Sequence, residues 1–595
     1  MSKRHLFNSA DGLVHRALRG LVACKPSLNL DTTNRVVLDS SHHESRVSLI
    51  SGGGSGHEPA WAGFVGSNML AAAVQGDIFA SPSTRQIVAA VEAVPSREGT
   101  ILVITNYTGD CLHFGLANEK VKAQGRRCRL LVCGDDVSVG RTAGRVGRRG
   151  LAGQISVIKV MGAAAGAGAS LDDVYDLGSA LSAQIVSMAA TLDHCHVPGR
   201  TEHGALADDE VEIGTGPHNE PGYEKLSPVP EPADLVRRLL RHCLDETDAD
   251  RAYVSFAAGD ETVLLVNNFG GMSQLELLAL VHETLEQLDR EWKMKPVRVY
   301  AGPLETSLNA PAFSLSVINL TAAAGGCRYS VDDIKAFLDV RTDTCWEAVA
   351  AGEQAIDRPR REHEELPKPA SLPDGPSVDA DRDLRLDPSV LERMLRSACA
   401  ALVEAEPDLT RWDTVMGDGD CGQTLKTGSS AVLAALDRGL ARSGSVGEVL
   451  LELEDVAESK MGGTLGGILG ILFVSLRSAV EARVVDRRAG ETTLTVWAAA
   501  LSTALTSLRR YTPAEVGHRT VMDTLIPFSD SLPDGFGAAV SAALAGAEAT
   551  RTMKPQLGRA TYVRAEHGRE MPPDPGAWAA MVVIRALHHG LGASE

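Results

Sequence analysis

The chain has 595 residues, which is too long for one hydrophobic core and predicts several domains. Hydrophobic residues make up 44% and charged residues 23%, as in ordinary globular proteins, so disorder throughout is excluded. The net charge of -19, with no strongly basic stripe to offset it, argues against nucleic acid as a partner.

The sequence predicts neither secretion nor a membrane partner. Its first residues lack a continuous apolar segment, and no apolar run is long enough to span a bilayer. Ten cysteines occur singly, without a Cys-x-x-Cys pair, which suits a reducing compartment better than a disulfide framework. We therefore expect a cytoplasmic protein.

The first half alternates apolar strands, small polar turns and helical segments. Strands are expected at residues 46–50, 100–104 and 129–132, and again at 262–268, 297–300 and 313–318. This alternation predicts two α/β subdomains, residues 1–190 and 191–350. In such layers ligands collect at the carboxyl ends of the strands.

The second half is predicted to be an all-α helical bundle, residues 387–595. Residues 351–386 are rich in Pro, Asp, Glu and Arg and lack apolar periodicity, so we expect a linker there. Asp387-Pro388 has the pattern of a helix start. Further helices are expected near residues 423–438, 446–458, 467–484, 494–510, 533–549 and 576–592.

The segment Ser51-Gly-Gly-Gly-Ser-Gly-His-Glu-Pro59 follows an expected strand and precedes an expected helix. Its glycines permit a tight backbone whose amides a small polar ligand can reach. It is not a phosphate loop of the Gly-Lys type, because the chain has no Gly-Lys dipeptide. His57 is a candidate acid-base group, and the alternative is a histidine that hydrogen-bonds a helix end.

A second strand-end loop is Asn106-Tyr-Thr-Gly-Asp110. Loops that follow strands of one sheet commonly share a crevice, so His57 and Asp110 are candidates for a general acid-base pair. The alternative for Asp110 is an ordinary turn cap. His218 lies in a third loop, between three glycines and two prolines within residues 212–222, where a histidine could attack a carbonyl group.

A metal site is an alternative for part of the first half. His194, Cys195 and His196, together with His203, are potential ligands. Their spacing matches no common zinc pattern.

Three carboxylates crowd into eight residues of the second half, at Asp413, Asp418 and Asp420. Such oxygens are the ligands that Mg²⁺ prefers, and Mg²⁺ keeps positions open for water and substrate phosphates. A nucleotide-phosphate site is therefore one interpretation, and a solvated acidic turn is the other. A calcium loop fits badly, because Ser429 stands where the bidentate Glu is required.

Other segments of the second half could line the same end of the bundle. Met461-Gly-Gly-Thr-Leu-Gly-Gly467 could bring helix amides to a phosphate or simply allow close helix packing. Arg519 offers a cation, and Asp574-Pro-Gly-Ala577 begins the last expected helix.

These motifs, in this order, resemble the dihydroxyacetone kinase family in its single-chain, ATP-dependent form. The resemblance covers nearly the whole chain. It is carried by Gly-Gly-Gly-Ser-Gly-His-Glu-Pro, Gly-Asp-Ile-Phe-Ala-Ser-Pro-Ser (76–83), Asn-Tyr-Thr-Gly-Asp, Gly-Asp-Asp-Val (134–137), the His218 loop, Gly-Asp-Gly-Asp-Cys-Gly, Met-Gly-Gly-Thr, Gly-Arg-Ala-Thr-Tyr-Val (558–563) and Asp-Pro-Gly-Ala.

The resemblance implies that His218 binds the carbonyl of dihydroxyacetone as a covalent hemiaminal. It implies that His57 and Asp110 handle the proton of the attacking hydroxyl, while the substrate lies against Gly54, Ser55, Gly56 and Thr105. It further implies that two Mg²⁺ ions, held by Asp413, Asp418 and Asp420, clamp the phosphates of ATP. The implied nucleotide contacts are Asp420, Cys421, Gly422, Gln423, Gly463, Thr464, Leu465, Arg519, Asp574, Pro575 and Gly576.

The chain departs from the family pattern at several positions. Thr105 stands where the family commonly has a substrate-contacting Lys, which bears on substrate preference. Leu465 replaces a second hydroxyl residue, and His518 replaces Asp. The segment that begins at Gly302, Gly-Pro-Leu-Glu-Thr-Ser-Leu-Asn-Ala-Pro, is looser than the usual Gly-Thr-x-Met-Thr-Ser-Leu pattern.

The leading hypothesis is a kinase that transfers phosphate from ATP to dihydroxyacetone, with glyceraldehyde as a further candidate substrate. One alternative is a lyase that forms AMP and cyclic flavin phosphate from FAD at the same nucleotide site, as some relatives do. The other is a non-catalytic regulatory homologue. The resemblance also implies a homodimer.

Overall fold

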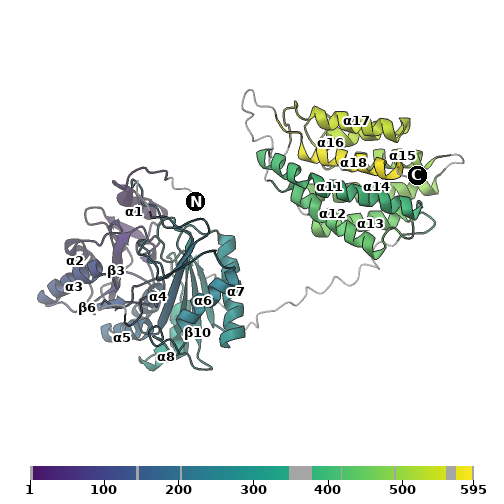
Figure 1. Ribbon diagram of the computed structural model, residues 1–595. Helices are drawn as coiled ribbons and strands as arrows, with labels where there is room; N and C mark the ends of the chain where they lie inside the picture. Colours follow the sequence, from purple (N-terminus) through teal and green to yellow (C-terminus); the bar gives the residue numbers. More distant parts are fainter. Residues whose placement is uncertain are drawn as a thin grey trace. The chain divides into compact units, whose positions relative to one another are not determined.

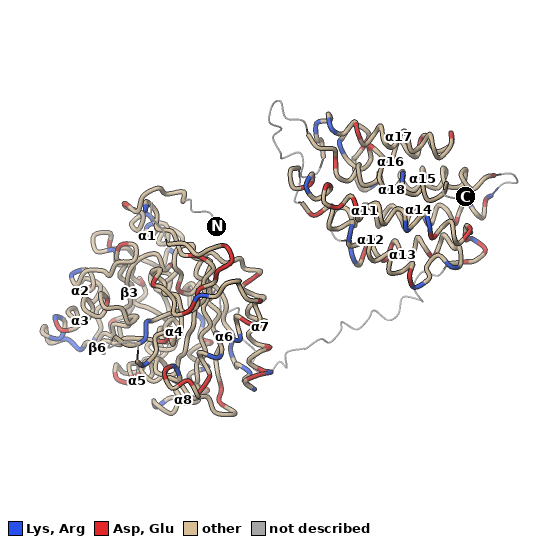
Figure 2. Tube along the Cα trace, in the orientation of Figure 1, with Lys and Arg blue, Asp and Glu red and all other residues tan. Residues whose placement is uncertain are grey.

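The computed structural model describes residues 5–142, 146–200, 204–347, 378–416, 419–461, 463–487, 491–557 and 571–592. The chain divides into two compact units, Met1–Glu362 and His363–Glu595 (Figure 1). The first is α/β and the second is helical, as predicted. Lys and Arg are interspersed with Asp and Glu over each unit (Figure 2). Among the described helices, none combines the length and apolarity needed to cross a membrane.

The first sheet has the strand order β1-β2-β4-β3-β5-β6, and its strands from β4 to β6 run parallel. The predicted strands at residues 46–50, 100–104 and 129–132 are confirmed as β3, β5 and β6. Helices α2 and α3 cover one face of this sheet through an apolar cluster that includes Phe114 and Leu102. The elements are α1 Leu13–Cys24, β1 Leu28–Asp31, β2 Val36–Asp39, β3 Ser48–Ser55, β4 Ala72–Ile78, α2 Thr84–Ala93, β5 Thr100–Thr105, α3 Thr108–Ala123 and β6 Cys128–Cys133.

The second sheet has the order β11-β10-β12-β7-β8-β9 and is antiparallel except between β10 and β11. Its first strand begins at Ile185, so the predicted subdomain boundary at residue 190 falls inside this strand. The elements are α4 Gly153–Gly166, α5 Leu171–Ser182, β7 Ile185–Thr191, β8 Val211–Ile213, β9 Glu224–Leu226, α6 Pro232–Leu244, β10 Thr262–Asn268, α7 Gln274–Trp292, β11 Arg298–Gly302, β12 Ala312–Asn319, α8 Leu320–Gly325 and α9 Val331–Asp339.

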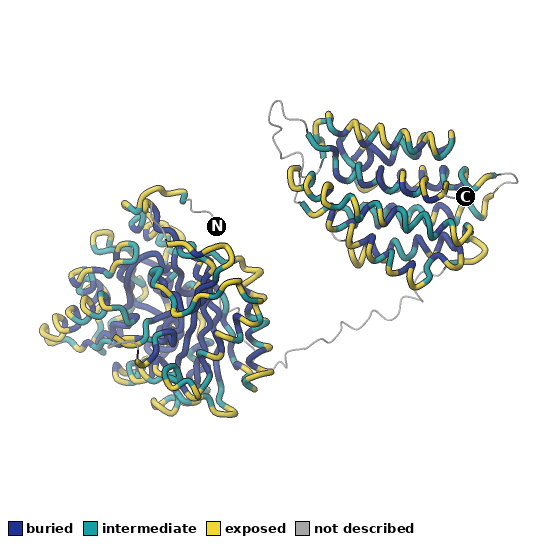
Figure 3. The backbone as a smooth tube through the Cα atoms, in the orientation of Figure 1, coloured by how far each residue is buried: buried dark blue, intermediate teal, exposed yellow. Residues whose placement is uncertain are grey.

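Helix α4 lies between the two sheets and contacts β3, β7 and β12 (Figure 1). It is mostly apolar and almost entirely buried, as expected for a helix with no solvent face (Figure 3). Its Lys159 donates to the carbonyls of Phe337 and Val340, 2.8 and 2.7 Å away, which satisfies a cation inside the core. One apolar cluster therefore includes strands of both sheets, and the two subdomains share a core.

The helical unit begins where the sequence predicts. Asp387 Oδ1 accepts hydrogen bonds from the amides of Ser389 and Val390, so it caps α11. Helix α16 was not predicted, because Pro527 interrupts its pattern. The helices are α11 Pro388–Met416, α12 Cys421–Arg438, α13 Val446–Lys460, α14 Gly463–Val485, α15 Thr493–Leu508, α16 Met522–Ser531, α17 Phe536–Ala549 and α18 Pro575–Gly592.

The predicted linker is too long at its C-terminal end. Residues 351–377 lie outside the described residues, but residues 378–386 belong to the helical unit. Leu384 is buried beside Val446 and Leu450, and the amide of Leu386 donates to Gly444 O over 3.0 Å. Two buried or paired leucines in a polar segment are too weak a periodic signal for sequence analysis to find.

Candidate functional site

The glycine-rich segment before His57 is a strand, not the loop and helix expected. Strand β3 continues through Gly52, Gly53 and Gly54, and only a three-residue 3-10 turn, Ala62–Phe64, follows. A Cβ at Gly53 would lie 2.6 Å from the ring of Trp61, and one at Gly52 would lie 2.3 Å from Val74 O. These glycines therefore serve close packing, which lets β3 deliver His57 at its end.

His57 lies beside His218, although 161 residues separate them. Their Nε2 atoms are 3.1 Å apart, and the rings are perpendicular. Nδ1 of His57 is 2.7 Å from the carbonyl oxygen of Thr306. Phe79 stacks on His57 and meets the edge of His218, so the pair has an aromatic wall.

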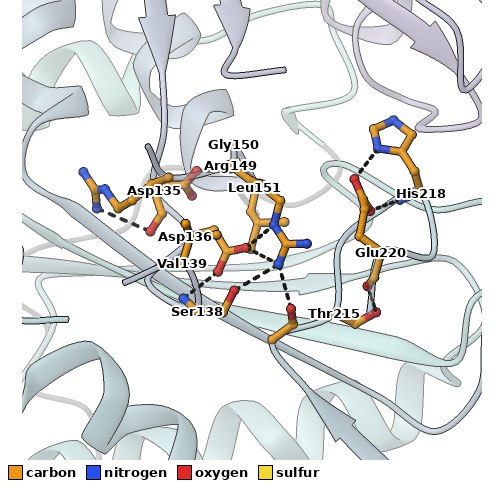
Figure 4. A network of polar contacts seen from close by, with 12 residues as sticks. Asp135, Asp136, Ser138, Val139, Arg149, Gly150, Leu151, Thr215, His218 and Glu220 are labelled. Atoms are coloured by element: carbon orange, nitrogen blue, oxygen red, sulfur yellow. Dashed lines mark hydrogen bonds and ion pairs between the residues drawn. The ribbon is translucent and has the colours of Figure 1, made fainter. Parts of the chain in front are cut away.

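Hydrogen-bond partners determine how many protons this pair holds. Thr306 O can only accept, so Nδ1 of His57 carries a proton. Nδ1 of His218 donates to Glu220 Oε1 over 3.0 Å, and the backbone N–H of His218 donates to Oε2 over 2.8 Å (Figure 4). Two unprotonated Nε2 atoms cannot bond each other, so the 3.1 Å contact requires one further proton between them.

The pKa values of His57 and Glu220 are both affected by burial and by contact with His218. Burial and the adjacent His218 lower the pKa of His57 to about 3, so His57 is not the cationic member of the pair near neutral pH. Burial would raise the pKa of Glu220, but the hydrogen bond and charge of His218 outweigh it and lower the pKa to about 2. Glu220 is therefore an ionised carboxylate that accepts from both the ring and the backbone of His218.

Asp110 lies in the first turn of α3 and is buried. Burial raises its pKa to about 6, against the opposing effects of a hydrogen bond from Ser81 and the charge of His218. One of its oxygens has no partner among the described residues. Asp110 is thus near His218 without a hydrogen bond to it in the described contacts, and it titrates close to neutrality, as a proton acceptor requires.

Two of the other predicted substrate contacts, Ser55 and Gly56, already donate hydrogen bonds within the protein. The hydroxyl of Ser55 donates to Gly76 O over 2.9 Å, and the amide of Gly56 donates to Glu58 Oε2 over 3.0 Å. Thr105 is buried at the end of β5 and lies against Gly150. Tyr107, which the sequence analysis did not single out, places its ring edge against His218.

A loop of the second sheet holds the His57 segment in place. Besides the Thr306 contact, the amide of Leu308 donates to Gly56 O over 2.8 Å, and the hydroxyl of Ser307 donates to Pro217 O over 2.5 Å. Glu305 in this loop is buried, and burial raises its pKa well above the usual range. The histidine pair therefore exists only where the two sheets meet.

The alternative metal site in the first half gains no support. His194 Nε2 lies 3.2 Å from Glu212, and Asn219 Oδ1 accepts from the amide of Cys195. His203 lies outside the described residues. Within the parts of the chain that are described, no three potential ligands meet.

In the helical unit, acidic side chains surround Cys421. Asp413 Oδ2 accepts from the amide of Cys421 over 3.0 Å, and Asp420 directly precedes α12. Burial and the charges of Asp413, Asp574 and Asp420 raise the pKa of Cys421 to about 12. Asp418 lies outside the described residues. These carboxylates act on the same thiol, but among the described residues no three of these side chains come together as metal ligands.

Asp574 adds a further acid to this cluster. Its Oδ1 accepts from the amide of Ala577 over 2.8 Å and so caps α18. Burial raises its pKa to about 6, although Arg519 opposes that shift. Pro575 and Gly576 form the first turn, which directs helix amides toward the acidic end.

Arg519 is buried, and it does not project freely toward a ligand. Its Nε donates to Thr550 O over 3.1 Å and its Nη2 donates to Pro572 O over 2.7 Å, while Nη1 has no partner among the described residues. Asp523 accepts from the amides of Gly517 and Thr520, which holds Arg519 at a φ of 59°. Its main role in the structure is to fix the segment before α18.

The remaining predicted nucleotide contacts lie at helix starts. Gly463, Thr464 and Leu465 begin α14, where Thr464 is exposed and Leu465 is half-buried. Gly422 is packed against Glu406 O and Thr410, and Gln423 beside it is exposed. Along α14 a groove of about 430 Å³ is lined by Ala457, Glu458, Met461, Gly466, Gly467, Gly470, Ile471, Val474, Ser475 and Tyr511.

Comparison with known proteins agrees with both units. Residues 19–345 match the family model of the Dak1 domain, and residues 415–589 match that of the DAK2 domain. The chain is 41% identical to a dihydroxyacetone kinase of Pichia angusta, with 97% of each chain covered, and 34% identical to the human triokinase/FMN cyclase, with 99% of each covered.

A solved structure gives the same result. The dihydroxyacetone kinase from C. freundii, in complex with AMP-PNP and Mg²⁺, superposes with a TM-score of 0.60 at 28% identity. The alignment covers 99% of this chain and 100% of that one. The chain therefore belongs to the dihydroxyacetone kinase family.

Proposed function

We propose that the protein transfers the γ-phosphate of ATP to dihydroxyacetone, which His218 holds as a hemiaminal. The single observation that supports this most is the His57–His218–Glu220 arrangement, in which the two Nε2 atoms lie 3.1 Å apart and Nδ1 of His218 lies 3.0 Å from Glu220. The curated relatives named as dihydroxyacetone kinases support the substrate, since they align over nearly the full chain.

The geometry suits addition of a ketone to His218. As Nε2 of His218 forms a bond with the carbonyl carbon, the shared proton passes through His57 to the carbonyl oxygen, which becomes a hydroxyl. No other proton is needed, and His218 keeps one positive charge. The carboxylate of Glu220, 3.0 Å from Nδ1, stabilises that imidazolium.

Asp110 is the proposed acceptor for the proton of the attacking hydroxyl. Its pKa of about 6 leaves it ionised at neutral pH yet basic enough to take a proton. The covalent bond would hold the hydroxyl in one place, which reduces the entropic part of the barrier. Tyr107 and Phe79 place their rings against the ring of His218 and so flank the proposed adduct.

The helical unit is the proposed ATP site. Asp413, Asp418 and Asp420 would hold two Mg²⁺ ions, which when bound neutralise the phosphate oxygens. The capped start of α18 offers amides at the same acidic cluster. The apolar, glycine-lined groove along α14 has room for the nucleoside part.

The test compares wild-type protein with His218→Ala on dihydroxyacetone, glyceraldehyde and glycerol, measured as ATP consumption. We expect the wild type to use the two carbonyl compounds and not glycerol, and the variant to use none. His282→Ala is the matched control, because His282 is exposed on α7 and pairs only with Glu286 among the described contacts. Glycerol turnover equal to that of dihydroxyacetone would refute the covalent mechanism.

A second activity has support from one class of relative. The human, bovine and mouse relatives are named triokinase/FMN cyclase and align over 99% of this chain. We propose to assay FAD cleavage to AMP with the same variants. Cleavage that persists in His218→Ala but is lost in Asp413→Asn would assign the lyase reaction to the helical unit alone.

A further inference from the structure

We propose that Arg149 is a positioning residue that acts on His218 through the loop of residues 214–220 and through Glu220. The inference rests on the proposed role of His218. It also gives a function to the Gly-Asp-Asp-Val motif, residues 134–137, which neither the histidine pair nor the acidic cluster uses.

Arg149 connects the first sheet's edge to the loop that carries His218. Its Nε lies 2.9 Å from Asp136 Oδ2, and its Nη2 lies 2.8 Å from the same oxygen (Figure 4). Nη2 also donates to the hydroxyl of Ser138 over 2.9 Å and to Gly214 O over 2.7 Å. Gly214 directly follows β8, so this bond fixes the point where the His218 loop leaves the sheet.

The third guanidinium nitrogen lies beside Glu220. A Cβ at Gly216 would meet Glu220 Oε2 at 2.2 Å and Arg149 Nη1 at 2.5 Å. Both atoms therefore lie on the same side of Gly216, close to each other but without an ion pair within 4.0 Å. Burial would lower the pKa of Arg149, but the charges of Asp136 and, less strongly, of Tyr107 and Glu220 outweigh it and raise the pKa. A cation at this place favours the carboxylate orientation that bonds His218.

The anchor of Arg149 is rigid. The side chain of Asp136 is fully buried, and its Oδ1 accepts from the amide of Ser138 over 2.9 Å. The amides of Asp135 and Asp136 both donate to Arg149 O over 3.0 Å. Asp135 in turn accepts from the amides of Leu151 and Gly153 at the start of α4. Because Asp136 holds the guanidinium of Arg149 in place, the bond from Arg149 to Gly214 O can fix the position of the His218 loop.

The nature of these contacts separates positioning from general stability. Arg149 bonds one carbonyl of the His218 loop and lies next to the carboxylate that holds the ring of His218. Arg148, its neighbour in sequence, instead donates to Ile185 O over 2.7 Å and lies over the ring of Tyr253. Arg148 thus offers a matched control with similar burial and no described contact to the loop.

The test measures kcat/KM for dihydroxyacetone and KM for ATP at pH 8 in the full-length protein. We expect Arg149→Met to lower kcat/KM for dihydroxyacetone about 100-fold, the penalty for a misplacement of about 1 Å, with KM for ATP unchanged. Arg149→Lys should lose nearly as much, because an ammonium cannot bond Asp136, Ser138 and Gly214 together. Arg148→Met should stay within about threefold of wild type.

Coupling to Glu220 is the decisive measurement. If Arg149 acts through Glu220 and its loop, then adding Arg149→Met to a Glu220→Gln variant should lower kcat/KM for dihydroxyacetone by less than about threefold. The inference is overturned if the losses of kcat/KM in the two single variants multiply in the double variant. It is also overturned if Arg148→Met loses as much kcat/KM as Arg149→Met, or if Arg149→Met raises KM for ATP in parallel. If Arg149→Met does not fold, the Arg149→Lys pair carries the same test.

Failure of this inference is distinguishable from failure of the proposed function. An active His218→Ala variant would refute the proposed function regardless of Arg149. An inactive His218→Ala together with a fully active Arg149→Met would refute only the positioning role.

Discussion

Glu220→Gln offers the sharpest test of the proton shared by the histidine pair. Gln has the same shape and can still accept from Nδ1 of His218, which now bonds Glu220 at 3.0 Å. Because Gln has a single carbonyl oxygen, the substitution removes the negative charge and also the acceptor of the His218 backbone N–H, which now bonds Oε2 at 2.8 Å. Because the resting pair and the hemiaminal both carry one positive charge, Glu220 stabilises both of them relative to a neutral pair.

The size of the effect follows from the pKa of Glu220. Its fall from 4.5 to about 2, net of burial, which opposes it, corresponds to about 3 kcal/mol in favour of the ionised form, and the hydrogen bond and charge of His218 contribute most of it. The Glu220 side chain is 32% exposed, so solvent screening reduces this to about 2 kcal/mol. By linkage, the pair in the variant should release its proton at a pH lower by about 1.5 units.

The assay is the pH profile of kcat/KM for dihydroxyacetone. The basic limb, where the pair loses the proton that the hemiaminal needs, should move to lower pH by 1 to 2 units, at about 1.4 kcal/mol per unit. The acid limb, near pH 6, reports Asp110 and should not move. At pH 8 the loss should reach about 30-fold and nearly vanish near pH 6.

A loss that is the same at every pH would refute this reasoning, because it would mean that Glu220 only holds the loop. A basic limb that stays in place or moves to higher pH would show that no proton is shared between His57 and His218. Asp209→Asn is a suitable control, since Asp209 is an exposed carboxylate that bonds Ser227.

Three further predictions concern other parts of the chain. Glu305→Met should raise the free energy of unfolding of the first unit by about 1 to 3 kcal/mol, because it removes a buried oxygen without a described partner. Burial raises the pKa of Glu305 above 4.5, so the wild type loses stability as the pH rises from that value. The urea midpoint of the variant should therefore exceed that of the wild type by more at pH 8 than at pH 5. An equal difference at the two pH values would contradict a neutral Glu305 carboxyl group. Asp413→Asn should weaken the binding of Mg²⁺-ATP at least about tenfold in a fluorescence titration, in which Trp412 and Trp578 are the reporters. The control Asp408→Asn, at an exposed carboxylate that bonds Arg411, should bind Mg²⁺-ATP as the wild type does. An unchanged affinity of Asp413→Asn for Mg²⁺-ATP would exclude Asp413 as a metal ligand. Gly53→Ala should destabilise the unit by about 1 to 3 kcal/mol, because its Cβ would meet the buried ring of Trp61 at 2.6 Å, while Gly115→Ala on α3 meets no atom within 4 Å and should be neutral or stabilising. Equal melting temperatures for these two variants would contradict the packing argument.

Local patterns sufficed for most elements and for the family. Strands β3, β5 and β6 were visible as apolar runs before turns, and Asp387 was visible as a helix cap. Patterns failed where tertiary packing overrides them. Gly52 to Gly54 appeared to be a loop, yet they extend β3 because Trp61 and Val74 leave no room for side chains.

The sequence by itself determined the family and supplied the candidate site residues. His57, Asp110, His218 and the acids from Asp413 to Asp420 stand in motifs whose order along the chain indicates the family, and motif order is a property of sequence alone. Glu220, two residues beyond His218, was present in the same loop but had no distinguishing signal.

Only the tertiary structure decided how those residues act together. His57 and His218 belong to different sheets, and their contact depends on the shared core around α4 and on Thr306, 249 residues from His57. The contact between the two histidines, the bond of His218 to Glu220 and the bond of Arg149 to Gly214 O all span about 3 Å, between residues far apart in the sequence or within one loop. Sequence periodicity records which face of a strand or helix is buried, but it contains no information about which distant side chains will meet.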